Sequence, residues 1–478
     1  MQHNSPGYSI TVRLNYPDRV AFLGRITSVI GEAGASIGAI DVVDAMRDRI
    51  TRDITINVHS VEHGQTVVEK LRGIDALDVQ HVSDRVFLCH LGGKLEVASR
   101  VPLKTRDDLS MAYTPGVARV CTAIAENPDS AFTLTIRRNT VAVVSDGSAV
   151  LGLGNIGAKA AMPVMEGKAV LFKEFGGVDA FPICLDTQDT DEIVRIVTAM
   201  SPGFGGINLE DISAPRCTEI EERLSEQLDI PVFHDDQHGT AIVVLAALRN
   251  ALQIVEKELE SSRLVINGAG AAGAAIANLL RAVGCKDLII CDSSGSIHRN
   301  RDGLSAPKQA LAQWSNPQQL EGSLSDVIAD ADVFIGVSVK DALSIDDVRR
   351  MADSPIVFAL ANPDPEIAPE SALGVAKVMA TGRSDYPNQI NNVLCFPGLF
   401  RGLLDVRAKT INQQMKIAAA EAIASIIDPN DLHPEYVIPS VFDRRVAERV
   451  ASAVAEAAVQ TGVARKHLRG DEPSINRS

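Results

Sequence analysis

The sequence predicts an α/β protein of several domains, and three observations lead to this fold class. The first ninety residues have the strand and helix order β-α-β-β-α-β, which is typical of a ferredoxin-like module. From Val141 onward, apolar strand-like runs alternate with helical runs, which predicts parallel sheets. A glycine-rich string, Gly268–Gly273, lies between a strand and a helix, as in a Rossmann-type dinucleotide-binding domain.

The composition limits the classes of protein to which this chain can belong. Its 478 residues are 46% apolar, which is enough for several hydrophobic cores. The net charge of −15 argues against nucleic acid or an anionic membrane as the main partner. Seven scattered cysteines without a CxxC pair favour a reducing compartment. No secretory signal and no apolar run of about 20 residues is visible, so we expect a cytoplasmic protein.

The N-terminal segment predicts a small antiparallel sheet covered by helices. Its sequence at Asn15–Gly24 and Gly31–Gly38 resembles an ACT domain, a small regulatory module. The resemblance implies a site for a small effector at Asn15, Asp18, Gly34 and Gly38. A dimerisation module without a ligand is the alternative. The expected strands are Tyr8–Leu14, Ile37–Val43, Ile50–His59 and Val79–Val82, and the expected helices are Arg19–Ala33 and Thr66–Leu71.

Two acidic pairs follow predicted strands in the middle of the chain. Glu210-Asp211 follows Gly206–Leu209, and Asp235-Asp236 follows Pro231–Phe233. Carboxyl ends of parallel strands collect at one edge of a sheet, so these acids should share a site. Like charges repel unless a cation neutralises them, and oxygen ligands favour Mg²⁺ or Mn²⁺. The alternative is that Asp235 and Asp236 cap the following helix.

A second glycine string, Gly152–Gly157, also has the GxGxxG spacing. We do not interpret it as a dinucleotide site, because the predicted next strand, Ala169–Phe172, is followed by Lys173 and not by an acid. Lys168 precedes that strand. A lysine beside a divalent cation loses its proton more easily and could act as a base, whereas an isolated lysine is usually a solvated surface charge.

The cofactor half has the full dinucleotide-binding order. Strand Arg263–Asn267, the glycine turn and a helix are followed by strand Asp287–Cys291 and the terminal acid Asp292. Asp292 would bind the adenine ribose and repel a 2′-phosphate, and Ser293-Ser294 supply no cation, which favours NAD over NADP. The predicted cofactor contacts are Gly268, Ala269, Gly270, Ala271, Ala272, Gly273, Asp292, Ser338 and Asn362.

The C-terminal part adds strands, asparagine-rich turns and two amphipathic helices. Asparagines at strand ends, such as Asn362 and Asn392, can hold a carboxylate or a nicotinamide, although asparagine often only shapes turns. We expect three domains, at 1–88, at 89–238 (the catalytic half) and at 239–402 (the cofactor half). Helices within 403–462 should pack back on the catalytic half, and 463–478 should form a flexible tail. The expected strands are Val333–Val337, Ile356–Leu360, Lys377–Ala380 and Val393–Phe396, and the helices are Leu403–Ile427 and Arg444–Thr461.

Several short motifs, taken in order from about residue 91 to 462, are together similar to a malic enzyme of the compact bacterial form. The resemblance implies metal-dependent oxidative decarboxylation of malate to pyruvate with NAD or NADP, in a homo-oligomer. It implies that Glu210, Asp211 and Asp236 bind Mg²⁺ or Mn²⁺, that Lys168 is the base assisted by Asp235, that Tyr113 is the acid, and that Asn362 and Asn392 contact substrate or nicotinamide. The motifs are Ala112–Gly116, Glu166–Lys168, Leu209–Asp211, His234–Thr240, Gly268–Gly273, Asn362–Pro365 and Asn391–Val393.

Two other functions remain open at this stage. An ACT-regulated amino-acid dehydrogenase has a similar two-domain plan but needs no metal. A catalytically inactive effector-binding sensor is the second alternative. The presence of Lys168, Tyr113 and all the acidic positions argues against the sensor.

Overall fold

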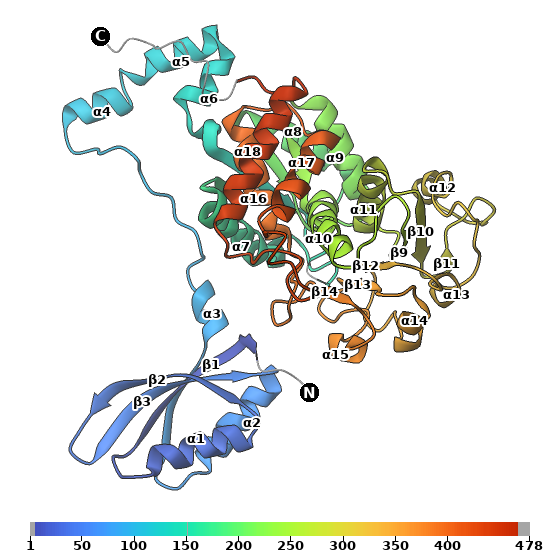
Figure 1. The fold of residues 1–478 in the computed structure, drawn as a ribbon. Helices are drawn as coiled ribbons and strands as arrows, with labels where there is room; N and C mark the ends of the chain where they lie inside the picture. The colour runs from blue at the N-terminus through green and yellow to red at the C-terminus, as the bar shows by residue number, and fades with distance from the viewer. Residues whose placement is uncertain (1–4, 151, 467–478) are drawn as a thin grey trace. The chain divides into compact units, whose positions relative to one another are not determined.

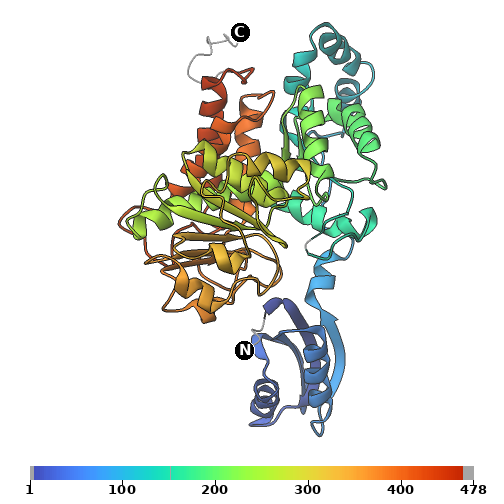
Figure 2. The same cartoon turned by 90° about the vertical axis from the view of Figure 1, so that its right-hand side faces the viewer.

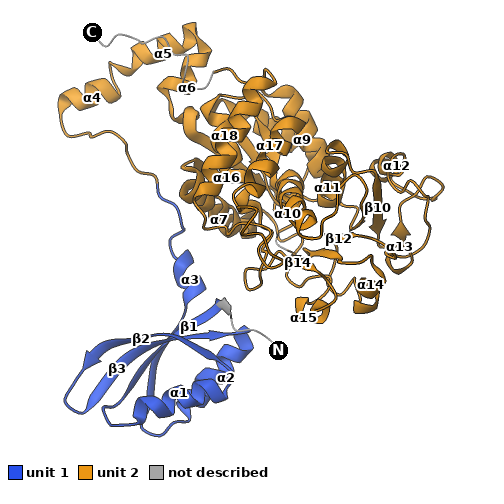
Figure 3. Cartoon of the chain, in the orientation of Figure 1, with its two compact units in different colours: residues 1–96 blue, residues 97–478 orange. Residues whose placement is uncertain are grey.

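The computed structural model describes residues 5–150 and 152–466. The chain divides into two compact units, residues 1–96 and 97–478 (Figure 3). Among the described residues, no helix is long and apolar enough to cross a membrane. The tail predicted at 463–478 lies outside the described residues from 467 on.

Unit 1 has the predicted ferredoxin-like fold. Its sheet has the order β2-β3-β1-β4, and every pairing in it is antiparallel. Buried positions recur at helical spacing on α1, where Ile26 and Ile30 face the sheet. Ser60 caps α2 by accepting a hydrogen bond from the His63 amide. The elements are β1 (Ser5–Pro17), α1 (Phe22–Glu32), β2 (Ser36–Ala45), β3 (Arg49–Val58), α2 (Val61–Arg72), β4 (Asp78–Asp84) and α3 (Arg85–His90).

An arm of short helices opens unit 2. Residues 91–105 form neither helix nor strand, and Thr105 then caps α4 in a reciprocal capping box with Asp108. No residue of α4 or α5 is buried. In Figure 1 these two helices lie apart from the layered body of the unit, whereas in the view of Figure 2 they overlap its helices. The arm comprises α4 (Arg106–Ala112), α5 (Val117–Glu126), η1 (Pro128–Ser130), α6 (Ala131–Leu134) and η2 (Ile136–Asn139).

The catalytic half is built on a parallel sheet of order β6-β5-β7-β8. The predicted strand Ala169–Phe172 is wrong, because these residues belong to helix α7. Met165, Ala169 and Phe172 are buried at helical spacing, and so short an apolar run does not distinguish a buried helix face from a strand. The elements are β5 (Thr140–Ser145), α7 (Ala158–Gly176), β6 (Asp179–Cys184), α8 (Thr190–Met200), η3 (Ser201–Gly203), β7 (Gly206–Leu209), α9 (Arg216–Gln227), β8 (Val232–His234) and the π-helical turn η4 (Asp235–Gly239).

The cofactor half contains the predicted Rossmann-type sheet, of order β11-β10-β9-β12-β13-β14. All its pairings are parallel except that of the short edge strand β11. The elements are α10 (Thr240–Ile254), β9 (Arg263–Asn267), α11 (Ala271–Ala282), β10 (Asp287–Asp292), β11 (Gly295–Ser296), α12 (Ala306–Ala312), α13 (Leu324–Val327), β12 (Val333–Gly336), α14 (Ile345–Arg350), β13 (Ile356–Ala359), α15 (Pro369–Ala372) and β14 (Val378–Thr381).

Three C-terminal helices complete the core. The predicted strand Val393–Phe396 is wrong, because its residues lie in the 3-10 turn η5 (Asn392–Leu394) and the start of α16. The predicted long helix from Leu403 is two helices, since Arg407 adopts a φ of 51° and ends the first. The helices are α16 (Phe396–Asp405), α17 (Gln413–Ala424) and α18 (Arg445–Gln460).

Helix α16 packs against both α7 and α18 (Figure 1). Its Phe396 ring lies 4.7 Å from the Phe172 ring of α7, measured between centroids. On its other side it packs on α18, where a Cβ on Gly402 would lie 2.4 Å from the Ala451 carbonyl oxygen. One buried cluster of apolar residues includes residues of α7, the cofactor-half strands and the C-terminal helices.

Candidate active site

The two acidic pairs lie side by side at the carboxyl edge of the catalytic sheet. Leu209 of β7 is paired with His234 of β8, so the acids that follow each strand are neighbours. Carboxylate oxygens of Glu210, Asp211 and Asp236 lie within 4.8 Å of one another. The capping alternative does not describe this geometry, because neither η4 nor α10 has a side-chain cap. Three oxygen donors converging on one point instead match a Mg²⁺ or Mn²⁺ site.

Lys168 lies against these acids and not in solvent. It comes from the buried face of α7, and its Nζ donates to Glu210 Oε1 at 2.8 Å and to Asp235 Oδ2. Burial lowers the pKa of Lys168, but the negative charges of Asp235 and Glu210 raise it more, and the net pKa lies above its ordinary value. The alternative of a solvated surface lysine is therefore wrong.

The carboxylates carry more negative charge than one lysine balances. Burial raises the pKa of Glu210 well above its ordinary value; the neighbouring acids add to this effect, and Lys168 only opposes it. Burial likewise raises the pKa of Asp235, whose Oδ1 has no hydrogen-bond partner among the described residues. An added divalent cation would relieve this repulsion, so the residues present fit the metal that the resemblance implies.

The two asparagines make different contacts. Asn392, in η5, donates its amide to Asp235 Oδ2 at 3.1 Å and accepts from Thr240 Oγ1 at 3.2 Å. Asn362 follows β13, and its carbonyl oxygen would lie 3.0 Å from a Cβ placed on Gly152. The second glycine string thus packs closely against the turn at Asn362.

The reason given for not assigning a dinucleotide to Gly152–Gly157 is wrong. The next strand along the chain is β6, not the helical residues 169–172, and an acid, Asp186, lies two residues after β6 ends at Cys184. The residues after the next strand therefore do not exclude a dinucleotide site at Gly152–Gly157.

Tyr113 is not brought to the acidic cluster. It ends α4 on the arm, its side chain is 67% exposed, and the arm lies away from α7 in both views (Figures 1 and 2). Among the described residues, it makes no side-chain hydrogen bond with Lys168 or the acids. Within a single chain, the predicted base and the predicted acid are separated.

The glycine turn of the cofactor half has the predicted close approach. Gly268 has a φ of 122°, and a Cβ there would lie 2.4 Å from the Val337 carbonyl oxygen. A Cβ on Gly273 would lie 1.8 Å from the Gly268 carbonyl oxygen. Ala269, Gly270, Ala271 and Ala272 carry the chain into the amino end of α11, where free amides can bind a pyrophosphate.

Two cations lie beside Asp292, where the sequence predicted none. We expected no cation near it, but Arg301 Nη2 lies 2.6 Å from Asp292 Oδ1 and Lys308 Nζ lies 2.5 Å from Oδ2. Burial raises the pKa of Asp292, but hydrogen bonds from Lys308 and Arg301 outweigh it and lower the net pKa. Both cations follow Asp292 by several residues in the loop and α12, so the two residues next to the acid could not reveal them.

Ser338 lies in a hydrogen-bonded network that sequence reasoning missed. Its hydroxyl accepts from Asn267 Nδ2 at 2.9 Å and donates to Glu366 Oε1 at 3.0 Å. The fully buried Glu366 also accepts from the backbone amides of Ser338 and Ala361. One carboxylate thereby joins the loops that follow β12 and β13, and the Ser338 hydroxyl extends the network to Asn267 at the end of β9.

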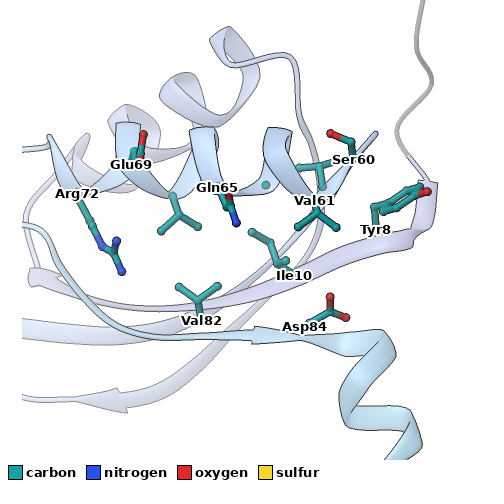
Figure 4. Close-up of a pocket in the computed structure, with 12 residues that line it drawn as sticks. Tyr8, Ile10, Ser60, Val61, Gln65, Glu69, Arg72, Val82 and Asp84 are labelled. Carbon is teal, nitrogen blue, oxygen red and sulfur yellow. The ribbon is translucent and has the colours of Figure 1, made fainter. Parts of the chain in front are cut away.

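The residues predicted to bind an effector do not line the cavity found in unit 1. The Asn15 side chain donates to Thr51 Oγ1 at 2.8 Å and accepts from Arg49 Nε, so its polar atoms already have partners. Asp18 and Gly34 lie in exposed or half-buried turns, and a Cβ on Gly38 would meet Thr55. A cavity of about 320 Å³ lies elsewhere in unit 1, between α2 and strands β1 and β4 (Figure 4).

Comparisons with known proteins agree with this geometry. Family models match for the malic enzyme N-terminal domain at residues 92–225, the malic enzyme NAD binding domain at 237–459 and the ACT domain at 4–82. The NAD-dependent malic enzyme of Geobacillus stearothermophilus is 60% identical over 96% of both chains. The bifunctional malic/malolactic enzyme of Bacillus subtilis is 58% identical over 78% of this chain and 92% of that protein.

A solved structure shares the fold of unit 2. The malic enzyme from Pyrococcus horikoshii is 49% identical, with a TM-score of 0.77 over 79% of this chain and 89% of that one. The family models, the high identity and the acidic site at the ends of β7 and β8 all lead to one conclusion: the chain belongs to the malic enzyme family and carries an N-terminal ACT domain.

Proposed function

We propose that this protein oxidatively decarboxylates (S)-malate to pyruvate and CO₂, with NAD as the hydride acceptor and Mg²⁺ or Mn²⁺ at Glu210, Asp211 and Asp236. The observation that carries the proposal is the buried Lys168, hydrogen-bonded to Glu210 and Asp235 beside the three converging carboxylates. A metal-independent amino-acid dehydrogenase has no use for these acids. An inactive effector-binding sensor likewise has no use for a buried lysine beside these carboxylates.

The residues divide the chemistry between them. When bound, the divalent cation supplies Lewis acidity that lowers the pKa of the C2 hydroxyl and stabilises the enolate left by loss of CO₂. Lys168 Nζ takes the C2 hydroxyl proton as hydride leaves C2 for the nicotinamide. It can do so only when the carboxylates are neutralised, since their charges outweigh burial and raise the pKa of Lys168. Asp235, itself held by Asn392, orients Lys168.

Protonation of C3 needs an acid, and we assign it to Tyr113 of a second copy of this chain. Tyr113 lies on an arm whose apolar side chains Leu109 and Met111 are 47% and 71% exposed. Such an apolar arm is stable in water when another surface covers it. A second copy supplies both that surface and a Lys168 site that lacks its acid, so a homo-oligomer with shared sites accounts for both observations.

The preference for NAD rests on the ion pairs of Asp292. In this structure Arg301 and Lys308 each pair with one oxygen of Asp292, so the charges of both cations are already balanced by the carboxylate. The remaining lone pairs of the carboxylate can accept the ribose hydroxyls, and its negative charge repels a 2′-phosphate. The relative from Geobacillus stearothermophilus, described as NAD-dependent, supports the same choice.

Replacing Asp292 by asparagine should shift cofactor use toward NADP. The change removes the charge that engages Arg301 and Lys308, so both cations become available to a 2′-phosphate. We expect the ratio of kcat/KM for NADP to that for NAD to rise by about tenfold or more. The double variant D292N/K308A serves as the control and should lose most of the gain. An unchanged ratio in D292N would contradict the assignment.

The activity itself is tested by following NADH formation from (S)-malate with Mn²⁺. We expect turnover with Mn²⁺, loss of turnover after addition of EDTA, and recovery on adding excess Mn²⁺. The same assay with candidate amino acids and acyl-CoAs would reveal an effector of the ACT domain. Turnover that persists in EDTA, or none with malate under any condition, would reject the proposal.

We also propose that the protein is located in the cytoplasm. All seven cysteines are free thiols, and Cys217, Cys285, Cys291 and Cys395 are buried. Burial raises the pKa of Cys285 and Cys291 to about 12, so these thiols are unreactive packing residues. Unpaired thiols favour a reducing compartment.

A further inference from the structure

Behind the acidic site, three ionisable side chains form a line of hydrogen bonds from three separate elements. Lys416 of α17 has its Nζ 3.0 Å from His238 Nδ1, in η4. The other ring nitrogen, His238 Nε2, lies 2.9 Å from Glu221 Oε2 of the buried α9 face. None of the three donates to, or accepts from, the carboxylates of Glu210, Asp211 or Asp236 in the described hydrogen bonds.

The hydrogen-bond roles in this line follow from chemistry. A lysine ammonium only donates, so His238 Nδ1 accepts and its Nε2–H donates to the Glu221 carboxylate. A neutral imidazole thus connects a cation to an anion. A buried carboxylate is costly unless it is paired and hydrogen-bonded, and Lys416 supplies the compensating charge across the ring.

Glu221 uses its carboxylate to hold both ends of the turn that carries the catalytic acids. Its Oε1 accepts from the His234 backbone amide at 2.9 Å, just before Asp235. Its Oε2 accepts from His238, just after Asp236 and Gln237. Gln237 is in turn held by Thr218 of the same helix, whose hydroxyl donates to Gln237 Oε1 at 3.1 Å.

The turn needs this support because of its backbone. Residues Asp235–Gly239 form a π-helical turn, a conformation that is rare and concentrated at functional sites. Three of the five residues, Asp235, Gln237 and Gly239, are buried, so water has little access to the turn. Hydrogen bonds with side chains of α9 stabilise the turn instead. The direction of the Asp235 and Asp236 carboxylates depends on this one short segment.

We infer that Lys416, acting through His238 and Glu221, is a positioning residue that sets the affinity of the acidic site for its divalent cation. Without Lys416, one of the positive charges that stabilise the buried Glu221 carboxylate is removed, and Glu221 weakens its hold on the π-helical turn. The inference rests on the proposed metal-dependent function, and it adds a residue from α17 whose side-chain hydrogen bond among the described residues is to His238 and not to a proposed metal ligand.

The test compares Lys416→Met with Lys416→Arg, using direct Mn²⁺ titration of each full-length protein by calorimetry. We expect the Kd for Mn²⁺ to rise by about 10- to 100-fold in K416M, the effect typical of losing an outer contact of a metal site. KM for Mn²⁺ should rise in parallel, while kcat at saturating Mn²⁺ and the Kd for NADH change by less than about threefold. K416R keeps a donor cation and should recover most of the affinity.

Two further measurements keep the outcome unambiguous. Glu221→Gln, which keeps the side-chain volume, should weaken Mn²⁺ binding as K416M does, whereas Glu219→Gln, at an exposed position of the same helix, should not. Wild-type Mn²⁺ affinity in K416M and E221Q would overturn the inference, and so would equal losses of Mn²⁺ and NADH affinity, which indicate general loosening. Mn²⁺ titration needs no turnover, so a wild-type protein that binds Mn²⁺ without oxidising malate would reject the proposed function and leave this inference standing.

Discussion

Replacing Asp236 by alanine is expected to abolish metal-dependent oxidation of malate. The variant removes one of three carboxylates that converge within 4.8 Å, and it also removes the acceptor of the Asp211 amide. A divalent cation held by two remaining protein oxygens binds weakly and is poorly oriented. We expect kcat/KM for malate to fall by at least about 10³-fold, which corresponds to about 4 kcal/mol of lost transition-state stabilisation. NADH formation at increasing Mn²⁺ measures the loss.

The control for this variant is another aspartate of unit 2. Asp191 of α8 is largely exposed and, within the described part of the chain, its ion pair is with Arg223, so Asp191→Ala should keep near-wild-type turnover. NADH binding should be unchanged in both variants, because the glycine turn lies in the other half of the unit. Near-normal activity of D236A in excess Mn²⁺ would refute the assignment of Asp236 as a metal ligand.

Mixing two inactive variants, Tyr113→Phe and Lys168→Met, is expected to restore malate oxidation. Each variant alone should lose about 10²-fold or more in turnover, since each lacks one proton-transfer group. If the arm of one copy completes the site of another, a mixed dimer contains one site with both native residues. Random exchange of subunits should then recover about a quarter of the wild-type activity. Co-expression with two different affinity tags, followed by tandem purification, isolates the mixed species.

The matched control separates shared sites from simple stabilisation. Lys168→Met mixed with Asp236→Ala places both defects on the same side of the shared site, so every mixed dimer keeps two damaged sites and stays inactive. Purified Y113F/K168M mixed dimers without activity would show that Tyr113 acts within its own chain or does not act at all. Activity in both mixtures would contradict the assignment of Lys168 and Asp236 to the same side of the shared site.

The order of strands, glycine turns and acidic residues could be predicted from the sequence, because each depends on a short stretch of residues. The ferredoxin-like order of the first ninety residues and the strand–turn–helix at Gly268–Gly273 need only short-range patterns, and the structure contains both. Acidic pairs after two parallel strands could be placed together, since strand ends of one sheet are neighbours. The wrong strand at Ala169–Phe172 shows the limit: four apolar residues carry no clear period.

The ion pairs and hydrogen bonds around the site could not be predicted from residues adjacent in sequence. Arg301 and Lys308 reach Asp292 across a loop and a helix, so inspecting Ser293-Ser294 led to the wrong conclusion about cations. The link that Glu366 makes between the loops after β12 and β13 could not be predicted, because a single glutamate after a proline turn is ordinary in sequence. Long-range ion pairs and hydrogen bonds have no periodic signature.

By itself, the sequence determined the kinds of chemistry available: carboxylates for a cation, a lysine for proton transfer, glycines for a pyrophosphate. These depend on residue type and on order along the strands, both of which are local. Only the tertiary structure decided the environment of each group, such as the burial of Lys168 among acids, the line from Lys416 to Glu221, and the separation of Tyr113 from its base. Burial and charge pairing arise from side chains far apart in the chain, and they set pKa values and ligand directions that no short motif contains.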